Sequence, residues 1–321
     1  MTEVRVGLVG VGGIGQTHLE RWRALETEGL GVRVAAVCDV DRDRAEATGL
    51  PAFTSVEGLL AGADLDAVDI CTPPKFHVPV ALAALAAGLP TLCEKPLATT
   101  IADARALRDA AEQAGKPLQV GFCHRFHDPI VHVKERLASG EWGRPLMFRN
   151  RFGTLFAGVE DTWFSNREMA GGGALMDTSV HSIDLFRCLM GEVTEASAML
   201  ATFDSAIQDV EDSATLLLRA NNGALGVVEA SWRTPFSVNV VEIYAERAAA
   251  IVDYDAGTLK TRRLGETDWQ AETLPGRDRF REELRHFAAV VRGEEAPRAD
   301  AEDGLRAVEI ILTAYGEGHR N

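Results

Sequence analysis

The chain has 321 residues, of which 46% are hydrophobic, 25% charged and 7% aromatic, a balance typical of a globular protein rather than a disordered or fibrous one. Its length predicts two domains, each large enough to bury its own core. The formal net charge of −15 excludes a protein that binds nucleic acid or anionic lipid surfaces through general electrostatic attraction.

Cysteine usage and the N-terminus indicate the compartment. The five cysteines are widely spaced and form no C-x-x-C pair or Cys/His cluster of the kind that binds zinc, so no metal site is expected. His124, His127 and His132 lie close in sequence, but their spacing does not favour a metal site either. The first residues lack the pattern of a signal peptide, and no 18 apolar residues run together. We expect a cytoplasmic protein with reduced thiols and no membrane contact.

Residues 4–121 alternate short β-branched runs with Ala-rich amphipathic stretches. Strands are predicted over 4–9, 32–37, 67–71, 91–93 and 118–120, and helices over about 17–26, 78–87 and 101–114. The last helix has Thr99 or Thr100 as its N-cap and ends at Gly115. Continuous apolar strands separated by helices are typical of a parallel sheet that is covered on both faces. Residues 1–122 are therefore predicted to form a doubly wound α/β domain.

The pattern changes after about Phe122. A helix is predicted over about 130–138, a strand over 146–152 and a helix after the triple glycine at 171–173. Further strands are predicted over 213–219, 224–232 and 237–244, linked by turns at 221–223 and 234–235. Helices over 279–292 and about 301–315 finish the chain. Residues 123–321 are expected to form a second α/β domain around an antiparallel or mixed sheet.

The first predicted strand runs directly into a G-x-G-x-x-G sequence, which consists of Gly10, Val11, Gly12, Gly13, Ile14 and Gly15. Between a strand and a helix such a loop binds a dinucleotide pyrophosphate, although the glycines alone are also compatible with an ordinary tight turn. Asp39 ends the second strand 24 residues after Gly15, near the spacing at which a carboxylate meets the adenosine ribose. This carboxylate favours NAD over NADP, while Arg42 nearby leaves the use of both cofactors open.

Five motifs then occur in order along the chain: the glycine loop at 10–15, Cys-Thr-Pro-Pro-Lys-Phe-His at 71–77, Glu-Lys-Pro at 94–96, Gly-Phe-Cys-His-Arg-Phe at 121–126 and Gly-Gly-Gly-Ala-Leu-Met-Asp-Thr-Ser-Val-His at 171–181. Together they resemble the Gfo/Idh/MocA family of glucose-fructose oxidoreductase, inositol dehydrogenase and rhizopine-catabolism proteins. The resemblance implies a Rossmann domain, then an α/β domain with a large, mostly antiparallel open sheet that often forms a dimer or tetramer interface. It also implies oxidation of a secondary alcohol, or reduction of a ketone, on a sugar, inositol or related polyol with a nicotinamide cofactor.

Lys95 is the first candidate for the chemistry. Hydride transfer needs one group that moves the hydroxyl proton and another that stabilises charge on the oxygen. Lys95 follows a predicted strand, and ligands of such folds bind at the carboxyl ends of the strands. A solvated lysine at a strand end is the alternative. By resemblance Lys95 contacts the reacting oxygen, Glu94 contacts the ribose or nicotinamide side of the cofactor, and Thr72, Pro73 and His77 line the nicotinamide half.

Asp177 and His181 are four residues apart in a predicted helix that runs to about Met190, so both side chains project from one face. Histidine suits general acid–base work at neutral pH, and the carboxylate can orient it or bind a substrate hydroxyl. Alternatively, Asp177 stabilises the helix dipole and His181 is a hydrogen-bonded histidine of the core. A metal site formed by this pair is not favoured, because the sequence shows no third ligand. The triple glycine is expected to let backbone pass close to a ligand.

Trp163 is a candidate for the wall of a sugar pocket, although a position in the core is equally compatible with the sequence. Arg125 is a further polar candidate near the substrate or the cofactor.

Two other functions stay open from the residues. Some proteins similar to this family are NAD-dependent glycosidases that cleave by transient oxidation, and a ligand-sensing regulator could keep the Rossmann fold without catalysis. Because the full set of candidate residues is present, an oxidoreductase is the preferred hypothesis. Its substrate is expected between the two domains.

Overall fold

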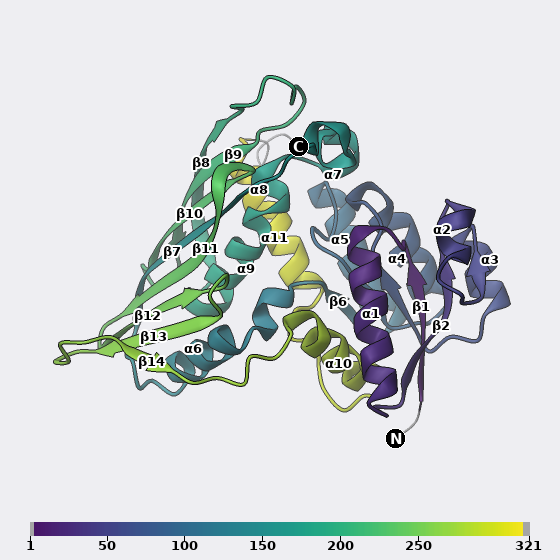
Figure 1. Ribbon diagram of the computed structural model, residues 1–321, viewed down its shortest axis with the longest axis horizontal. Coiled ribbons are helices and arrows are strands. Elements are labelled where there is room, and N and C mark those ends of the chain that lie inside the picture. The colour runs from purple at the N-terminus through teal and green to yellow at the C-terminus, as the bar shows by residue number, and fades with distance from the viewer. Residues whose placement is uncertain (1–2, 317–321) are drawn as a thin grey trace. The chain divides into compact units, whose positions relative to one another are not determined.

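The computed structural model describes residues 3–316, and the chain divides into two units that are each built around one sheet (Figure 1). Of the described residues, the first unit comprises 3–123 together with Asp278–Arg306. The second comprises His124–Arg277 and residues 307–316. Within the described part of the chain no helix is both long and apolar enough to cross a membrane.

The first unit contains a six-stranded sheet whose strand pairs are all parallel. Its strands in spatial order are β3 (Ala52–Phe53), β2 (Val32–Cys38), β1 (Val4–Val9), β4 (Ala67–Ile70), β5 (Thr91–Cys93) and β6 (Leu118–Val120). This is the strand order of a dinucleotide-binding fold, with the switch point between β1 and β4. The predicted doubly wound domain is confirmed. The two-residue β3 was not predicted because it is too short to show a pattern.

Helices connect these strands: α1 (Gly13–Thr27), α2 (Arg42–Glu46), α3 (Val56–Gly62), η1 (Pro74–Phe76), α4 (His77–Ala86) and α5 (Ile101–Ala114). The ends of α5 follow the predicted signals. The Thr100 hydroxyl accepts a hydrogen bond from the Asp103 N–H, and Gly115 adopts a left-handed conformation with φ of 60°. A short helical turn, η2 (Cys123–Phe126), follows β6.

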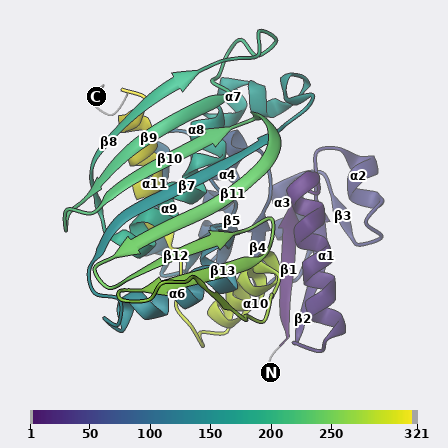
Figure 2. The same ribbon diagram turned by 60° about the vertical axis from the view of Figure 1, so that its left-hand side comes forward.

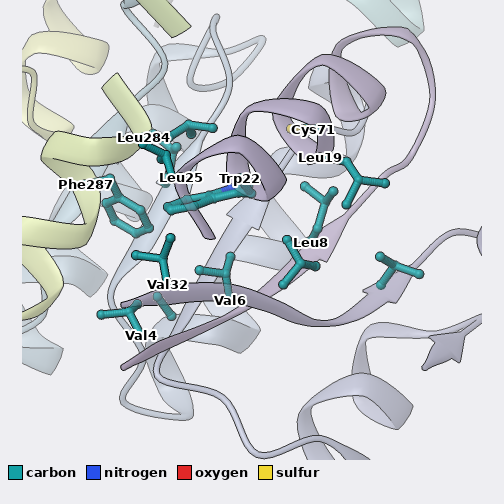
Figure 3. Close-up of a cluster of buried hydrophobic side chains, with 14 of the residues drawn as sticks. Val4, Val6, Leu8, Leu19, Trp22, Leu25, Val32, Cys71, Leu284 and Phe287 are labelled. Atoms are coloured by element: carbon teal, nitrogen blue, oxygen red, sulfur yellow. The ribbon is translucent and has the colours of Figure 1, made fainter. Parts of the chain in front are cut away.

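The last part of the first unit comes from far along the chain. Helix α10 (Arg279–Val291) packs Leu284 and Phe287 into a core that includes Trp22 and Leu25 of α1 (Figure 3). A single division at residue 122 therefore does not describe the two units, because the chain returns to the first one. The sequence predicts the helix itself, but which sheet its apolar face covers depends on side chains about 250 residues away.

The second unit contains an eight-stranded sheet in the spatial order β14-β13-β12-β11-β7-β10-β9-β8. The bounds of its strands are β7 (Pro145–Leu155), β8 (Val193–Ala201), β9 (Ser213–Ala220), β10 (Leu225–Ser231), β11 (Arg233–Ala245), β12 (Ala248–Asp253), β13 (Thr258–Arg263) and β14 (Gln270–Glu272). Only the β7–β10 pair is parallel, which confirms a large, mostly antiparallel sheet. The turn predicted at 234–235 is wrong: these residues lie in β11, where pairing with β7 is interrupted between Arg233 and Val238.

The helices of the second unit are α6 (Asp128–Ala138), η3 (Val159–Asp161), η4 (Trp163–Ser165), α7 (Arg167–Ala170), α8 (Ala174–Asp177) and α9 (Ser179–Met190); α11 (Ala301–Ala314) begins in the first unit and ends in the second. Helix α9 covers one face of the sheet. Its Phe186 packs edge-on against Phe148 of β7, and a Cβ at Gly226 of β10 would lie 2.6 Å from the Phe186 ring. None of the helices described for this unit lies on the opposite face (Figure 2).

Candidate active site

The glycine loop combines two tightly packed glycines with two open ones. Gly10 has φ of 87°, and a Cβ there would lie 2.7 Å from the carbonyl oxygen of Cys71; a Cβ at Gly15 would collide with the Gly10 carbonyl. By contrast, no atom would lie within 4 Å of a Cβ at Gly13, and the nearest to one at Gly12 is 4.0 Å away. Ile14 packs on the core. The roles predicted for Gly10 and Gly15, the turn and the helix–strand packing, are confirmed.

The N-terminus of α1 is suited to an anion. It has no side-chain cap and no acidic residue in its first turn, so its N–H groups and the helix dipole are directed toward the space beside Gly12 and Gly13. A dinucleotide pyrophosphate fits this arrangement, because backbone N–H groups supply the hydrogen bonds and an open glycine face permits close approach.

Asp39 lies immediately after β2 and is held by backbone. Its Oδ2 accepts a hydrogen bond from the Val11 N–H at 2.9 Å, and its Oδ1 accepts one from the Asp41 N–H at 3.0 Å. Arg44 is the arginine beside this carboxylate, with Nη1 3.5 Å from Asp39 Oδ1. Arg42 instead faces Glu46 at 3.4 Å on the exposed side of α2. Arg44 was not predicted from the sequence, where its only signal is its place two residues after Arg42.

His77 joins the chain after β4 to the chain after β5. Its Nδ1 lies 2.9 Å from the Pro96 carbonyl oxygen and its Nε2 2.8 Å from the Thr72 carbonyl oxygen. Complete burial lowers the pKa of His77, although the two carbonyl groups act in the opposite direction. Both ring nitrogens therefore face backbone, and the ring fixes the turn of Thr72 and Pro73 against the loop that follows Lys95. The Thr72 hydroxyl is buried and has no hydrogen-bond partner among the described residues.

Glu94 and Lys95 follow β5 at the carboxyl end of the sheet. Glu94 is 5% exposed, and its Oε2 accepts a hydrogen bond from the Lys95 N–H at 3.1 Å. Gly121 makes room for this carboxylate, since a Cβ there would lie 2.6 Å from Glu94 Oε1. The Lys95–Pro96 peptide is cis. A buried carboxylate thus fixes the backbone from which the half-buried Lys95 side chain extends.

The triple glycine serves a different purpose from the predicted one. A Cβ at Gly173 would collide with the Glu211 backbone, and one at Gly172 with the Tyr315 hydroxyl. The Glu211 carboxylate accepts hydrogen bonds from the Gly173 N–H at 3.3 Å, the Leu175 N–H at 2.9 Å and the Tyr315 hydroxyl at 2.6 Å. At Gly172 and Gly173 the expectation that the glycines open the backbone to a ligand is wrong, because protein atoms fill the space and the Glu211 carboxylate accepts hydrogen bonds at the start of α8.

Asp177 and His181 lie on two short helices rather than one. Asp177 ends α8, His181 lies in α9, and Thr178 between them keeps a right-handed helical backbone. The Thr178 hydroxyl accepts a hydrogen bond from Trp232 Nε1 at 3.1 Å and donates one to Asp177 Oδ2 at 3.3 Å. Trp232 belongs to a small core with Val159 and Ile207. The break in the helix is therefore anchored to the core beneath it.

A column of aromatic rings supports His181. Its imidazole stacks on that of His124, with 4.3 Å between centroids and 11° between planes. His124 stacks in turn on Tyr254 at 4.8 Å, and Tyr254 on His127 at 4.2 Å. From the sequence, His124 and His127 were weighed only as metal ligands, and Tyr254 was not predicted. No local pattern could have found it, because Tyr254 follows β12, far along the chain.

The two remaining candidates differ in exposure. Arg125 forms a buried, bidentate ion pair with Asp184 of α9, with Nε–Oδ2 of 2.8 Å and Nη2–Oδ1 of 2.6 Å. This pair ties η2 to α9, so Arg125 supports the His124 segment. Trp163 is half-buried and stacks on Phe164 at 3.8 Å between centroids, outside the core cluster. Part of the Trp163 ring therefore remains available to a ligand.

Comparison with known proteins agrees with this architecture. The family model described as an oxidoreductase family with an NAD-binding Rossmann fold matches residues 4–122. The model of the GFO/IDH/MocA C-terminal domain matches residues 130–251. This chain belongs to the GFO/IDH/MocA oxidoreductase family. The family resemblance inferred from the five motifs is confirmed, as are the oxidoreductase class and the NAD-binding fold.

Similar proteins of this family act on sugars and polyols. The chain is 32% identical to inositol 2-dehydrogenase 2 of Saccharopolyspora erythraea, over 96% of this chain and 91% of that one. It is 28% identical to D-apiose dehydrogenase of Paraburkholderia graminis, over 96% of this chain and 86% of that one. Among solved structures, UDP-N-acetylglucosamine 3-dehydrogenase of Acidithiobacillus ferrooxidans superposes on this chain with a TM-score of 0.85 and 26% sequence identity. The superposition covers 99% of this chain and 98% of that one.

Proposed function

We propose that this oxidoreductase oxidises a secondary alcohol of a sugar, inositol or related polyol, or reduces the corresponding ketone. The observation that carries the proposal is Lys95, whose backbone is fixed by the Glu94 carboxylate at the carboxyl end of the NAD-binding sheet. The dehydrogenases of inositol and D-apiose to which the chain is similar support this substrate class.

The proposed mechanism divides the work among four side chains. In the oxidative direction, a nicotinamide cofactor held by the glycine loop and Asp39 would supply the acceptor for the hydride of the carbinol carbon. His181 takes the hydroxyl proton, so that the C–H and O–H bonds break while the C=O bond forms. Lys95 donates a hydrogen bond to the oxygen and stabilises the charge that develops there. Asp177 orients the substrate or His181, and Trp163 offers a ring face for the sugar to stack on.

The cofactor proposed is NAD, held by the open glycines and the N-terminus of α1. The Asp39 carboxylate is placed to accept hydrogen bonds from the adenosine ribose hydroxyls. It would repel a 2′-phosphate, whereas Arg44 beside it would attract one. Glu94, Thr72 and Pro73 are assigned to the nicotinamide half.

The test is an absorbance screen for the reduced nucleotide, run with sugars, cyclitols and their keto forms, with NAD and NADP, in both directions. Net formation of NADH with an alcohol is the expected result. Cleavage of a glycoside without net NADH would identify an NAD-dependent glycosidase instead. Calorimetry that detects no nucleotide binding would overturn the proposal.

We also propose that a second copy of the chain covers the open face of the eight-stranded sheet. The pairing register places Met147, Leu217, Leu225 and Tyr244 on that face, and all four side chains are exposed. Exposed apolar patches of this kind mark interfaces. Light scattering should report a dimer or tetramer that Leu217→Glu dissociates, whereas Leu264→Glu, at an exposed site outside the sheet, should leave it intact. A monomeric wild-type chain would contradict this proposal.

A further inference from the structure

The first unit contains a cluster of buried polar side chains in which the proposed mechanism uses only Glu94. The cluster also contains His18 of α1, Asp69 of β4 and Glu283 of α10. His18, Asp69 and Glu283 have no exposed surface. Charged groups in such a setting are costly unless they are paired, so the arrangement of protons in this cluster has consequences for Glu94.

His18 lies between two carboxylates. Its Nδ1 is 2.9 Å from Asp69 Oδ2, which also accepts a hydrogen bond from Trp22 Nε1 at 2.9 Å. Its Nε2 is 3.3 Å from Glu94 Oε1, an ion-pair distance without hydrogen-bond alignment. A neutral imidazole has one N–H and would present a lone pair to one of these carboxylates, whereas an imidazolium presents an N–H to both.

The groups around His18 agree with the charged form. Burial alone lowers the pKa of His18, and the Asp69 carboxylate, which lies 2.9 Å from Nδ1, opposes that effect. Burial also raises the pKa of Cys71, whose Sγ lies 3.3 Å from His18 Nδ1, so this thiol stays neutral. Asp69 is therefore the carboxyl group that faces Nδ1.

Glu283 brings a third carboxyl group to the cluster. Neither of its oxygens has a hydrogen-bond partner among the described residues, and its ligand oxygen lies within 4.8 Å of those of His18 and Glu94. Burial raises the pKa of Glu283 well above its ordinary value; Glu94 and Asp69 add to this effect, while His18 and Arg279 oppose it. Glu283 is thus a neutral acid beside the other two groups.

We propose that His18, as an imidazolium, and Glu283, as a neutral acid, are positioning residues that surround the Glu94 carboxylate, with His18 Nε2 3.3 Å from Glu94 Oε1, and thereby fix the backbone of Lys95. The link to Lys95 is the hydrogen bond from its N–H to Glu94 Oε2. This inference rests on the proposed function, in which Lys95 contacts the reacting oxygen. His18, Glu94 and Glu283 also have the side-chain types of a metal site, and all three are buried.

The protonation of the cluster can be tested without any activity. In the full chain labelled with ¹⁵N-histidine, the His18 ring should show two protonated nitrogens at pH 8, where an ordinary histidine is neutral. Glu94→Gln should lower the pH at which this signal titrates. A neutral His18 at pH 8 in the wild-type chain would overturn the proposal, and so would a stoichiometric metal ion that Glu283→Gln removes.

Kinetics test the positioning role. His18→Gln should lower kcat on the order of 100-fold, while the Kd for NAD measured by calorimetry stays unchanged. Glu283→Gln keeps the hydrogen-bond donor of a neutral acid and should rescue most of the activity that Glu283→Ala loses. Glu112→Gln, on the exposed side of α5, is the matched control. A His18→Gln chain that folds and keeps wild-type kcat would overturn the positioning role.

The NMR experiment and the kinetic experiment together distinguish a failure of this inference from a failure of the proposed function. If no alcohol or ketone is turned over by the wild-type chain, the proposed function fails while the protonation of His18 is still measured. If turnover is normal but His18 is neutral at pH 8, only the positioning role of His18 and Glu283 fails. The NMR arm uses the wild-type chain, so it does not depend on any variant folding.

Discussion

The imidazole of His181 lies nearly parallel to that of His124, with 4.3 Å between their centroids. The two rings come from α9 and η2, which the Arg125–Asp184 ion pair joins. Because a stacked neighbour restricts rotation about the side-chain bonds of His181, His124 fixes the ring that we assign to proton transfer. Stacked aromatic pairs contribute about 0.5–1.5 kcal/mol beyond their buried area.

Removal of the stack should therefore reduce turnover. His124→Ala is expected to lower kcat about tenfold, the equivalent of about 1.4 kcal/mol, whereas His124→Phe, which keeps a flat ring, should retain most of it. Steady-state kinetics on the substrate found by the screen provide the measurement. Equal losses in both variants would show that the stack does not position His181.

Loss of the proposed catalytic groups should have a larger effect. Lys95→Ala and His181→Ala are each expected to lower kcat by about 10²–10⁴-fold, the range for a general acid–base group, with nucleotide binding retained. Lys116→Ala, at an exposed site after α5, is the matched control and should behave as wild type. If both Lys95→Ala and His181→Ala keep wild-type turnover, the assignment of these residues is wrong.

Cofactor preference provides a third prediction, which uses a pair of neighbouring arginines. Arg44→Ala should weaken the use of NADP by about tenfold, because Arg44 lies beside Asp39 where a 2′-phosphate would sit. Arg42→Ala should change neither cofactor's kcat/KM, since Arg42 pairs with Glu46 on the exposed side of α2. Asp39→Ser should shift preference toward NADP. The measurement is the ratio of kcat/KM with NADP to kcat/KM with NAD. A change in the Arg42→Ala variant without a change in the Arg44→Ala variant would contradict the prediction.

Glu283 should make the free energy of unfolding depend on pH. Burial raises the pKa of Glu283 in the folded chain, so above the ordinary glutamate pKa the folded state holds a proton that the unfolded state has lost. The stabilisation contributed by protonated Glu283 is complete below the ordinary glutamate pKa, and it is lost as the pH rises toward the raised pKa of the folded chain. Glu283→Gln removes this dependence, and the variant should gain stability relative to wild type between pH 5 and pH 8. Urea unfolding midpoints measured at both pH values check this; a gap that stays constant or narrows would contradict it.

Much of the first unit was predictable from local pattern. The strand bounds, the cap at Thr100 and the left-handed Gly115 follow from β-branched runs and from residues with strong conformational preferences. The glycine loop was equally predictable from the sequence, since only glycine fits at Gly10 and Gly15, where a Cβ would collide with backbone atoms. In the second unit β8 and β12–β14 were missed, because one exposed face per strand weakens the apolar signal.

The sequence by itself determined the family, the NAD-binding sheet and the candidates Lys95, Asp177 and His181, because each belongs to a motif that is contiguous along the chain. Tertiary structure alone decided which side chains surround them. Glu211 and Tyr315 fill the space above the triple glycine, Tyr254 supports His124, and α10 returns to place Glu283 beside His18 and Glu94. These contacts join residues separated by tens to hundreds of positions, and they form because buried surfaces and buried charges must find partners that no local pattern specifies.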